Sequence, residues 1–133
     1  MGRARRLGLL LDSATLIWWV LDNGRLSLAA GVAIRSANRV VVSSVTAMEL
    51  ATKLRVGKLP QVQPLVDSFE ERCQADGFEL LPLHHRHALR GGMIPCEHRD
   101  PFDRMLAGQA IIEDLTLVSP DTAFDALGAR RLW

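Results

Sequence analysis

HRDPFDRMLAGQA, residues 98–110, combines a helix start, two carboxylates and a run of small side chains. Pro101 suits the first turn of a helix, where its missing N–H is not needed, and Asp100 before it is a good N-cap. These signals predict a helix over 101–114 with Asp103 in its first turn. As isolated residues, Asp100 serves equally well as a cap, and Asp103 as an acid that compensates the helix dipole.

The composition around this stretch is that of a folded protein. Of the 133 residues, 48% are hydrophobic and 23% are charged, which is too apolar for a disordered chain. The length predicts a single domain over 1–133. The net charge of +1 gives no overall field that would indicate nucleic acid, although arginines make both ends locally basic, at positions 3, 5, 6, 130 and 131.

The cysteines and the apolar runs indicate the cellular compartment of the protein. Cys73 and Cys96 lie far apart without CxxC spacing, so they indicate neither a disulfide framework nor a zinc site. No segment approaches the roughly 20 apolar residues that a membrane helix requires. We therefore expect a cytoplasmic protein with no membrane partner.

Short apolar runs alternate with helical patterns along the chain. Alternation of this kind predicts an α/β fold in three layers, with a central, mostly parallel sheet of four to five strands flanked by helices. The predicted strands are 7–11, 40–43, 78–82 and 115–119, with a possible edge strand at 130–133. The predicted helices follow Asp12 and cover 26–38, 45–56, 61–76, 84–89, 101–114 and 122–127, with a break at Gly91-Gly92.

Acidic residues recur where predicted strands end. Asp12 directly follows the first strand, Asp121 follows the strand over 115–119, and Glu49 lies one turn into the helix after the second strand. Because the carboxyl ends of parallel strands meet at one edge, where ligands bind in open α/β sheets, these acids and Asp103 are expected to converge there.

Each acid also has a purely structural interpretation. Asp12 or Ser13 can cap the helix that follows, and Asp121 can cap a short helix of its own. Glu49 can form a solvated ion pair with Lys53, four residues later, which stabilises a helix by only a few tenths of a kcal/mol. Taken singly, these interpretations stay open.

Taken together, the four carboxylates predict a divalent metal site. Like charges at close range raise one another's pKa unless a counter-ion neutralises them. Carboxylate and water ligands suit Mg²⁺ or Mn²⁺, which activate water for the hydrolysis of phosphodiesters. Around the predicted catalytic and metal-binding set of Asp12, Glu49, Asp103 and Asp121, the possible outer partners are Asp100, Ser13 and Ser119, and the possible phosphate contacts are Arg99 and Arg104.

Two further groups of residues, histidines and tryptophans, suggest a functional site, but a structural role is the better prediction for each. His84, His85 and His87 lack the i,i+4 spacing of two ligands on one helix face, so a surface cluster is expected rather than a zinc site. Trp18 and Trp19 are expected to be core or dimer contacts rather than platforms for stacked bases.

The order and spacing of these motifs resemble the PIN domain, and within it the VapC-type toxins of bacterial and archaeal toxin–antitoxin pairs. The resemblance covers most of the chain and rests on LLLDSATLIWW (9–19), SSVTAMELATK (43–53) with GKL (57–59), GFELLP (77–82), HRDPFDRMLAGQA (98–110) and LVSPD (117–121). Where the closest subgroup has Thr-His and an aromatic residue, this chain has Ser13-Ala14 and Met48, which bears on substrate details.

The resemblance implies a metal-dependent endoribonuclease that cleaves RNA and is held inactive by a cognate antitoxin protein. The family's acids correspond to Asp12, Glu49, Asp103 and Asp121, with Asp100 as a further acid near the metal. Such proteins usually form homodimers, and the antitoxin tail covers the acidic groove. The alternative is a catalytically inactive protein-interaction module with a PIN-like fold, in which the acids serve only as caps.

Overall fold

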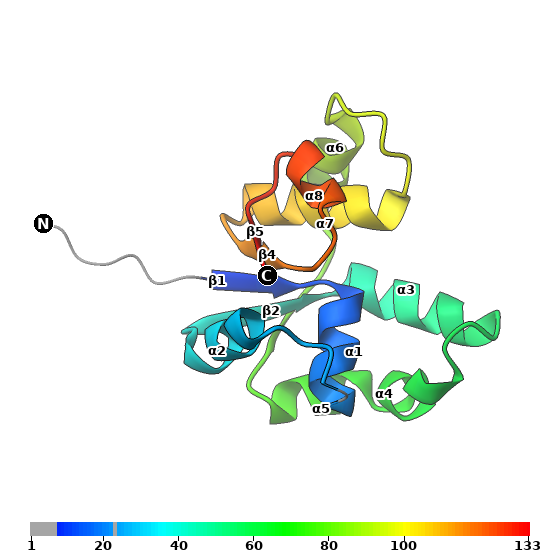
Figure 1. The fold of residues 1–133 in the computed structure, drawn as a ribbon. Helices are drawn as coiled ribbons and strands as arrows, with labels where there is room; N and C mark the ends of the chain where they lie inside the picture. The colour runs from blue at the N-terminus through cyan, green and yellow to red at the C-terminus, as the bar shows by residue number, and fades with distance from the viewer. Residues whose placement is uncertain (1–7, 23) are drawn as a thin grey trace, which may run out of the picture.

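A five-stranded sheet, all of whose paired strands are parallel, forms the centre of the computed structural model, which describes residues 8–22 and 24–133 (Figure 1). The strand order is β3-β2-β1-β4-β5. The strands are β1 (Gly8–Leu11), β2 (Arg39–Ser43), β3 (Glu79–Leu81), β4 (Thr116–Val118) and β5 (Arg131–Leu132). The predicted parallel α/β sheet is confirmed. Leu7, the first residue of the first predicted strand, and the arginines at positions 3, 5 and 6 lie outside the described residues.

The apolar run of β1 forms the middle of two hydrophobic cores. Leu9, Leu10 and Leu11 are fully buried and pair with both β2 and β4. Because side chains alternate along a strand, Leu9 and Leu11 enter the core on one face and Leu10 enters the core on the other. A central strand buried on both faces explains why the run lacks polar side chains.

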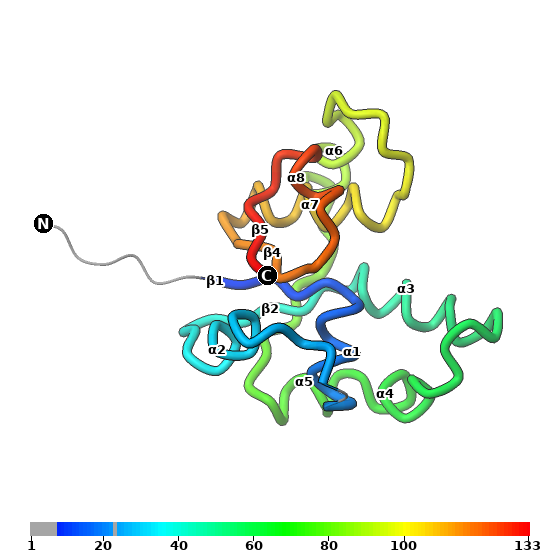
Figure 2. Tube along the Cα trace, viewed as in Figure 1, coloured from blue at the N-terminus to red at the C-terminus, as the bar shows by residue number. Residues whose placement is uncertain are grey.

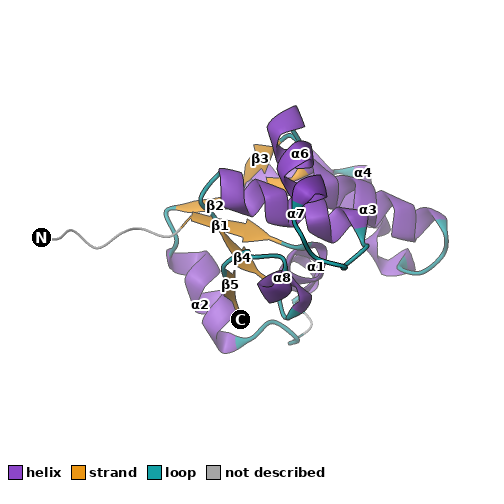
Figure 3. Cartoon of the chain, turned by 90° about the horizontal axis from the view of Figure 1, so that it is seen from above, coloured by secondary structure: helices purple, strands orange, loops and turns teal. Residues whose placement is uncertain are grey.

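Helices cover both faces of the sheet, which confirms the three predicted layers (Figures 1 and 3). On one face lie α1 (Ser13–Leu21), α2 (Leu28–Ser36), the 3₁₀ turn Pro60–Val62, α4 (Gln63–Asp67) and α5 (Phe69–Ala75). On the other lie α6 (His85–Met93), α7 (Pro101–Ile112) and α8 (Ala123–Ala126). The remaining helix, α3 (Ser44–Arg55), contributes Val45 to one core and Leu50 to the other.

Two predicted helices differ in extent from the structure. The single helix expected over 61–76 is interrupted at Ser68, whose φ of −134° is not helical. The Ser68 hydroxyl donates to the carbonyl of Pro64 at 2.9 Å, a local bond that competes with the helical pattern. The break expected at Gly91-Gly92 is also wrong, because α6 continues through both glycines to Met93.

The glycine of that pair that matters for packing is Gly91, which lies where α6 meets α7. A Cβ on Gly91 would overlap the carbonyl oxygen of Arg104, and a Cβ on Gly108 would overlap the carbonyl oxygen of His87. Gly92, in contrast, has no atom within 4 Å of an added Cβ. The backbones of α6 and α7 therefore approach closely at Gly91 and Gly108.

No helix within residues 8–22 and 24–133 is long and apolar enough to cross a membrane. Both cysteines are free thiols, as expected, with Cys73 buried and Cys96 partly exposed.

The adjacent glycines of α6 give a matched test of this packing. Gly91→Ala should lower the free energy of unfolding by about 2 kcal/mol, because the α7 backbone cannot yield to the added methyl group. Gly92→Ala should leave stability unchanged or raise it by up to about 1 kcal/mol through helix propensity. Urea unfolding of both variants measures the difference, and equal stabilities would contradict the close helix approach.

Candidate active site

Three helices begin at the edge of the sheet to which the strand arrows point (Figure 1). There α1 follows β1, α3 follows β2, and α7 begins nearby after the connection from α6. The segment from β4 to α8 leaves the sheet at the same edge. The predicted acids belong to these four places, so the topology brings their parts of the backbone to one side of the molecule.

Asp12 links the end of β1 to the start of α1. Its carboxylate oxygen Oδ1 accepts a hydrogen bond from the Thr15 amide at 2.8 Å, so Asp12 is the N-cap of α1. The side chain is buried, and burial is the main cause that raises its pKa above the ordinary value, with a contribution from the charge of Glu49. A hydrogen bond from the Ser119 hydroxyl acts in the opposite direction. Asp12 is therefore both a helix cap and a buried acid with a raised pKa.

Glu49 lies on α3 and its side chain is buried, with 9% exposure. Its Oε2 is 2.8 Å from the Nζ of Lys53, so the i,i+4 ion pair is present. The pair differs from the solvated pair of the structural interpretation, because only Lys53 reaches solvent, with 39% of its side chain exposed. Glu49 is thus held in a fixed position close enough to raise the pKa of Asp12.

Asp103 lies in the first turn of α7, where Asp100 is the N-cap as predicted. The Asp100 Oδ1 accepts from the amides of Phe102 at 2.9 Å and Asp103 at 3.3 Å. The Asp103 Oδ2 is 2.8 Å from the Nε2 of His98. Burial raises the pKa of Asp103, the charges of Asp100 and Asp121 raise it further, and the hydrogen bond with His98 lowers it.

Ser119 joins the remaining acid to the site. Its hydroxyl accepts a hydrogen bond from the Asp121 amide at 3.0 Å and also bonds to the Asp12 carboxylate. Asp121 itself is exposed, and its Oδ1 accepts from the Ala123 amide at 2.9 Å. The fully buried Ser119 therefore bridges Asp12 and the Asp121 backbone, while Ser13 is buried at the first position of α1.

The structure brings the acids together in two groups. The charge of Glu49 raises the pKa of Asp12, and the charges of Asp100 and Asp121 raise the pKa of Asp103. Within residues 8–22 and 24–133, however, no three His, Cys, Asp or Glu side chains are close enough together to hold a metal ion.

The donor set nevertheless fits a divalent cation by its chemistry. Asp12, Glu49, Asp103 and Asp121 all offer carboxylate oxygens, the donor type that Mg²⁺ and Mn²⁺ prefer. Asp12 and Asp103 carry raised pKa values because their charges are buried beside other acids. A bound cation would relieve this cost, so these four side chains are the ones that could hold it.

Arg104 has a different role from the predicted phosphate contact. Its guanidinium has five N–H donors, and each is directed at a backbone carbonyl. The acceptors are Gly91 at 3.1 Å, Gly92 at 3.2 Å, Ile94 at 2.5 Å, Cys96 at 2.9 Å and His98 at 2.7 Å. With every donor engaged, Arg104 organises its own loop and has none left for phosphate. Arg99 is exposed, and its contact with phosphate stays a prediction.

The histidines near α6 correct another expectation. His84 and His85 are exposed, but His87 is fully buried rather than part of a surface cluster. The His87 Nδ1 accepts from the His84 amide at 3.0 Å, and its Nε2 is 2.9 Å from the Oε2 of Glu113. Sequence reasoning missed the bond between His98 and Asp103, although His98 lies only five residues before Asp103 in the same motif.

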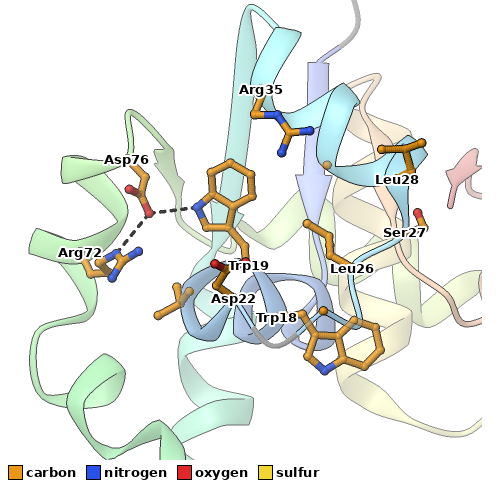
Figure 4. Close-up of a pocket in the computed structure, with 12 residues that line it drawn as sticks. Trp18, Trp19, Asp22, Leu26, Ser27, Leu28, Arg35, Arg72 and Asp76 are labelled. Atoms are coloured by element: carbon orange, nitrogen blue, oxygen red, sulfur yellow. Dashed lines mark hydrogen bonds and ion pairs between the residues drawn. The ribbon is translucent and has the colours of Figure 1, made fainter.

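The tryptophans lie away from the acids, around a pocket of about 480 Å³ between the α1 and α2 regions (Figure 4). Trp19 donates from Nε1 to Asp76 at 3.1 Å, and Trp18 packs against Trp133 with ring centroids 5.6 Å apart. Both rings pack against the core of that face, as one of the two expectations had it. None of the four acids lines this pocket.

Comparison with known proteins agrees with this architecture. The chain is 27% identical over 113 residues to ribonuclease VapC22 of Mycobacterium tuberculosis, which covers 84% of this chain and 85% of the relative. Its fold is similar to FitAcB from Neisseria gonorrhoeae, with a TM-score of 0.69, 20% identity and coverage of 94% and 96% of the two chains.

A second solved structure and a family profile complete the comparison. DNA-bound VapBC from Salmonella typhimurium gives a TM-score of 0.67 with 23% identity, over 95% of this chain and 97% of the other. The profile of the PIN domain matches residues 9–129, which include every acid of the candidate site. The chain therefore belongs to the PIN domain family.

Proposed function

We propose that this protein is a metal-dependent endoribonuclease, the toxin of a toxin–antitoxin pair, which hydrolyses RNA phosphodiester bonds with metal-activated water. The observation that carries the proposal is the burial of Asp12 beside Glu49, at the edge where Asp103 meets Asp121. Acids whose pKa values are raised by burial and by neighbouring charges are typical of functional sites. The likeness to ribonuclease VapC22 supports RNA as the substrate.

Mg²⁺ or Mn²⁺ bound by Asp12, Glu49, Asp103 and Asp121 would lower the pKa of a water molecule and neutralise charge on the scissile phosphate. The chain's own residues prepare these ligands. Ser119 and the Thr15 amide orient Asp12, and Lys53 orients Glu49. Each carboxylate is thus aligned by a neighbouring donor before any cation binds, as outer partners do in metal sites.

Other proposed roles surround this centre. Arg99 is exposed one residue before the N-cap of α7, where a cation could hold an RNA phosphate. Asp100 adds negative charge near Asp103, and Ser13 could orient water. A cognate antitoxin partner, a homodimer and a cytoplasmic location are proposed from the resemblance to VapC-type toxins and the fold shared with VapBC.

A second candidate function is a catalytically inactive interaction module. It is favoured by one observation, since Asp12, Asp100 and Asp121 all accept hydrogen bonds from amides at or near helix starts. In such a module the acids would be caps alone, and a divalent cation would change neither stability nor activity. A neighbouring reading frame for a short DNA-binding protein would favour the toxin instead.

Cleavage of total cellular RNA by the purified chain tests the nuclease directly. With Mn²⁺ or Mg²⁺ the wild type should cut RNA, and EDTA should stop it. Asp103→Asn should lower the rate at least about 100-fold, beyond the usual effect of losing an outer partner. Glu71→Gln, a change to an exposed acid on α5, should leave the rate unchanged.

Retained cleavage by Asp103→Asn would contradict the assignment of this residue as a metal ligand. An inactive wild type, confirmed free of any bound partner protein, would favour the interaction module. A rate that is equally high in EDTA would exclude metal-activated water as the nucleophile.

Asp12→Asn should stabilise the metal-free protein at pH 7. The pKa of Asp12 is raised on folding, so the wild type loses stability as the pH rises above 3.8 and through the folded-state pKa. Asn caps helices as well as Asp but carries no charge. We expect a melting temperature about 4 °C higher in EDTA, corresponding to about 1 kcal/mol.

The same variant should lose the stabilisation that Mn²⁺ gives to the wild type. Thermal unfolding with EDTA and with Mn²⁺, repeated between pH 3 and pH 7, measures both effects. A melting temperature below that of the wild type at pH 7 in EDTA would show that Asp12 acts mainly as a stabilising cap.

A further inference from the structure

Residues 94–100 form the connection between α6 and α7, whose backbone path can be followed in Figure 2. Arg104 reaches from the first turns of α7 to five carbonyls of the segment 91–98. We call this set of bonds the Arg104 clamp. The backbone bonds of this connection are few among the described residues, since Ile94 donates to Gly91, Cys96 donates to Ile94 and the carbonyl of Asp100 accepts from Arg104. The five bonds of the clamp therefore supply most of the polar contacts that fix its path.

His98 connects the clamp to the acidic site. Its carbonyl accepts from the Arg104 Nη1 at 2.7 Å, and its ring Nε2 lies 2.8 Å from the Asp103 Oδ2. The exposed fractions are 29% for the His98 side chain and 17% for that of Asp103, so the bond is partly shielded from water. A continuous path of contacts thus runs from Arg104 through His98 to a candidate metal ligand.

We propose that His98 and Arg104 are positioning residues, which orient the Asp103 carboxylate for the divalent cation. The inference rests on the proposed metal-dependent function. In the part of the chain that the structure describes, His98 is the one side chain that donates to Asp103. The ring fixes the carboxylate through Oδ2, and the Arg104 clamp fixes the backbone that carries the ring.

This assignment gives Arg104 and Lys53 different modes of action. The side chain of Lys53 bonds directly to Glu49. Arg104 acts on Asp103 only indirectly, by donating to the carbonyl of His98. The fork of five donors on a guanidinium suits this task, since an ammonium offers only three.

The test measures Mn²⁺ binding by electron paramagnetic resonance and RNA cleavage as a function of Mn²⁺ concentration. His98→Ala should weaken Mn²⁺ binding about 10-fold, the lower end of the effect of removing an outer partner. His98→Gln should restore most of the affinity, because its amide N–H can donate to Asp103 Oδ2. The KM for RNA at saturating Mn²⁺ should not change, since neither variant removes an RNA contact.

Arg104→Lys should also weaken Mn²⁺ binding although it retains His98, Asp103 and the positive charge. Glu97→Gln, an exposed change in the same connection, is the matched control and should bind Mn²⁺ like the wild type. Circular dichroism and thermal unfolding establish that each variant is folded. If Arg104→Lys does not fold, the comparison of His98→Ala with His98→Gln decides.

The outcomes separate this inference from the proposed function. A folded wild type that binds no Mn²⁺ would overturn the metal-dependent function itself. Binding that is lost in Asp103→Asn but unchanged in His98→Ala would overturn the positioning role alone. A loss in His98→Ala that His98→Gln does not restore would also overturn it, because the hydrogen bond would not be the cause.

Discussion

Carboxylates withdrawn from water at the carboxyl edge of the sheet are the constraint around which the molecule is arranged. A buried charge is costly unless it has hydrogen-bond donors or an opposite charge beside it. Here each of the three shielded acids has such a partner, as the Thr15 amide serves Asp12, Lys53 serves Glu49 and the ring of His98 serves Asp103. The partners offset the cost of burying these charges only in part, since the pKa of Asp12 stays raised, mainly by burial.

The scaffold makes this concentration of charge possible. Parallel strands with two apolar faces place β1 and β4 side by side, so Ser119 can bridge two acids that are more than 100 residues apart in sequence. On one face of the sheet, the glycine contacts between α6 and α7 bring the backbone of α6 against the turn that carries Arg104. Packing and site geometry therefore share the same few residues.

The sequence predicted what depends on local patterns. Apolar and β-branched runs identified the strands, and the caps at Asp12 and Asp100 follow from backbone amides a few residues away. The edge on which the acids lie followed from the rule that parallel strands end together. Metal binding by these acids stays a prediction.

Features that depend on distant partners were not predicted. Gly91 resembles a helix terminator until the backbone of α7 is beside it, and His87 resembles a surface histidine until Glu113 is opposite it. From sequence, Arg104 was only a possible phosphate contact. The acceptors of the Arg104 guanidinium are backbone carbonyls, and the pattern of side chains in a sequence does not predict the direction of backbone carbonyls.

The use of carbonyls has a consequence for variation in this part of the chain. A guanidinium that bonds to backbone oxygens is indifferent to the side chains of the segment, so residues such as Pro95 and Glu97 can change freely. Inserting or deleting a single residue is different, because it would shift most of the five oxygens out of reach at once. Apart from Ile94, which is buried, and His98 and Asp100, whose side chains bond to α7, the connection is therefore constrained by its number of residues rather than by its composition.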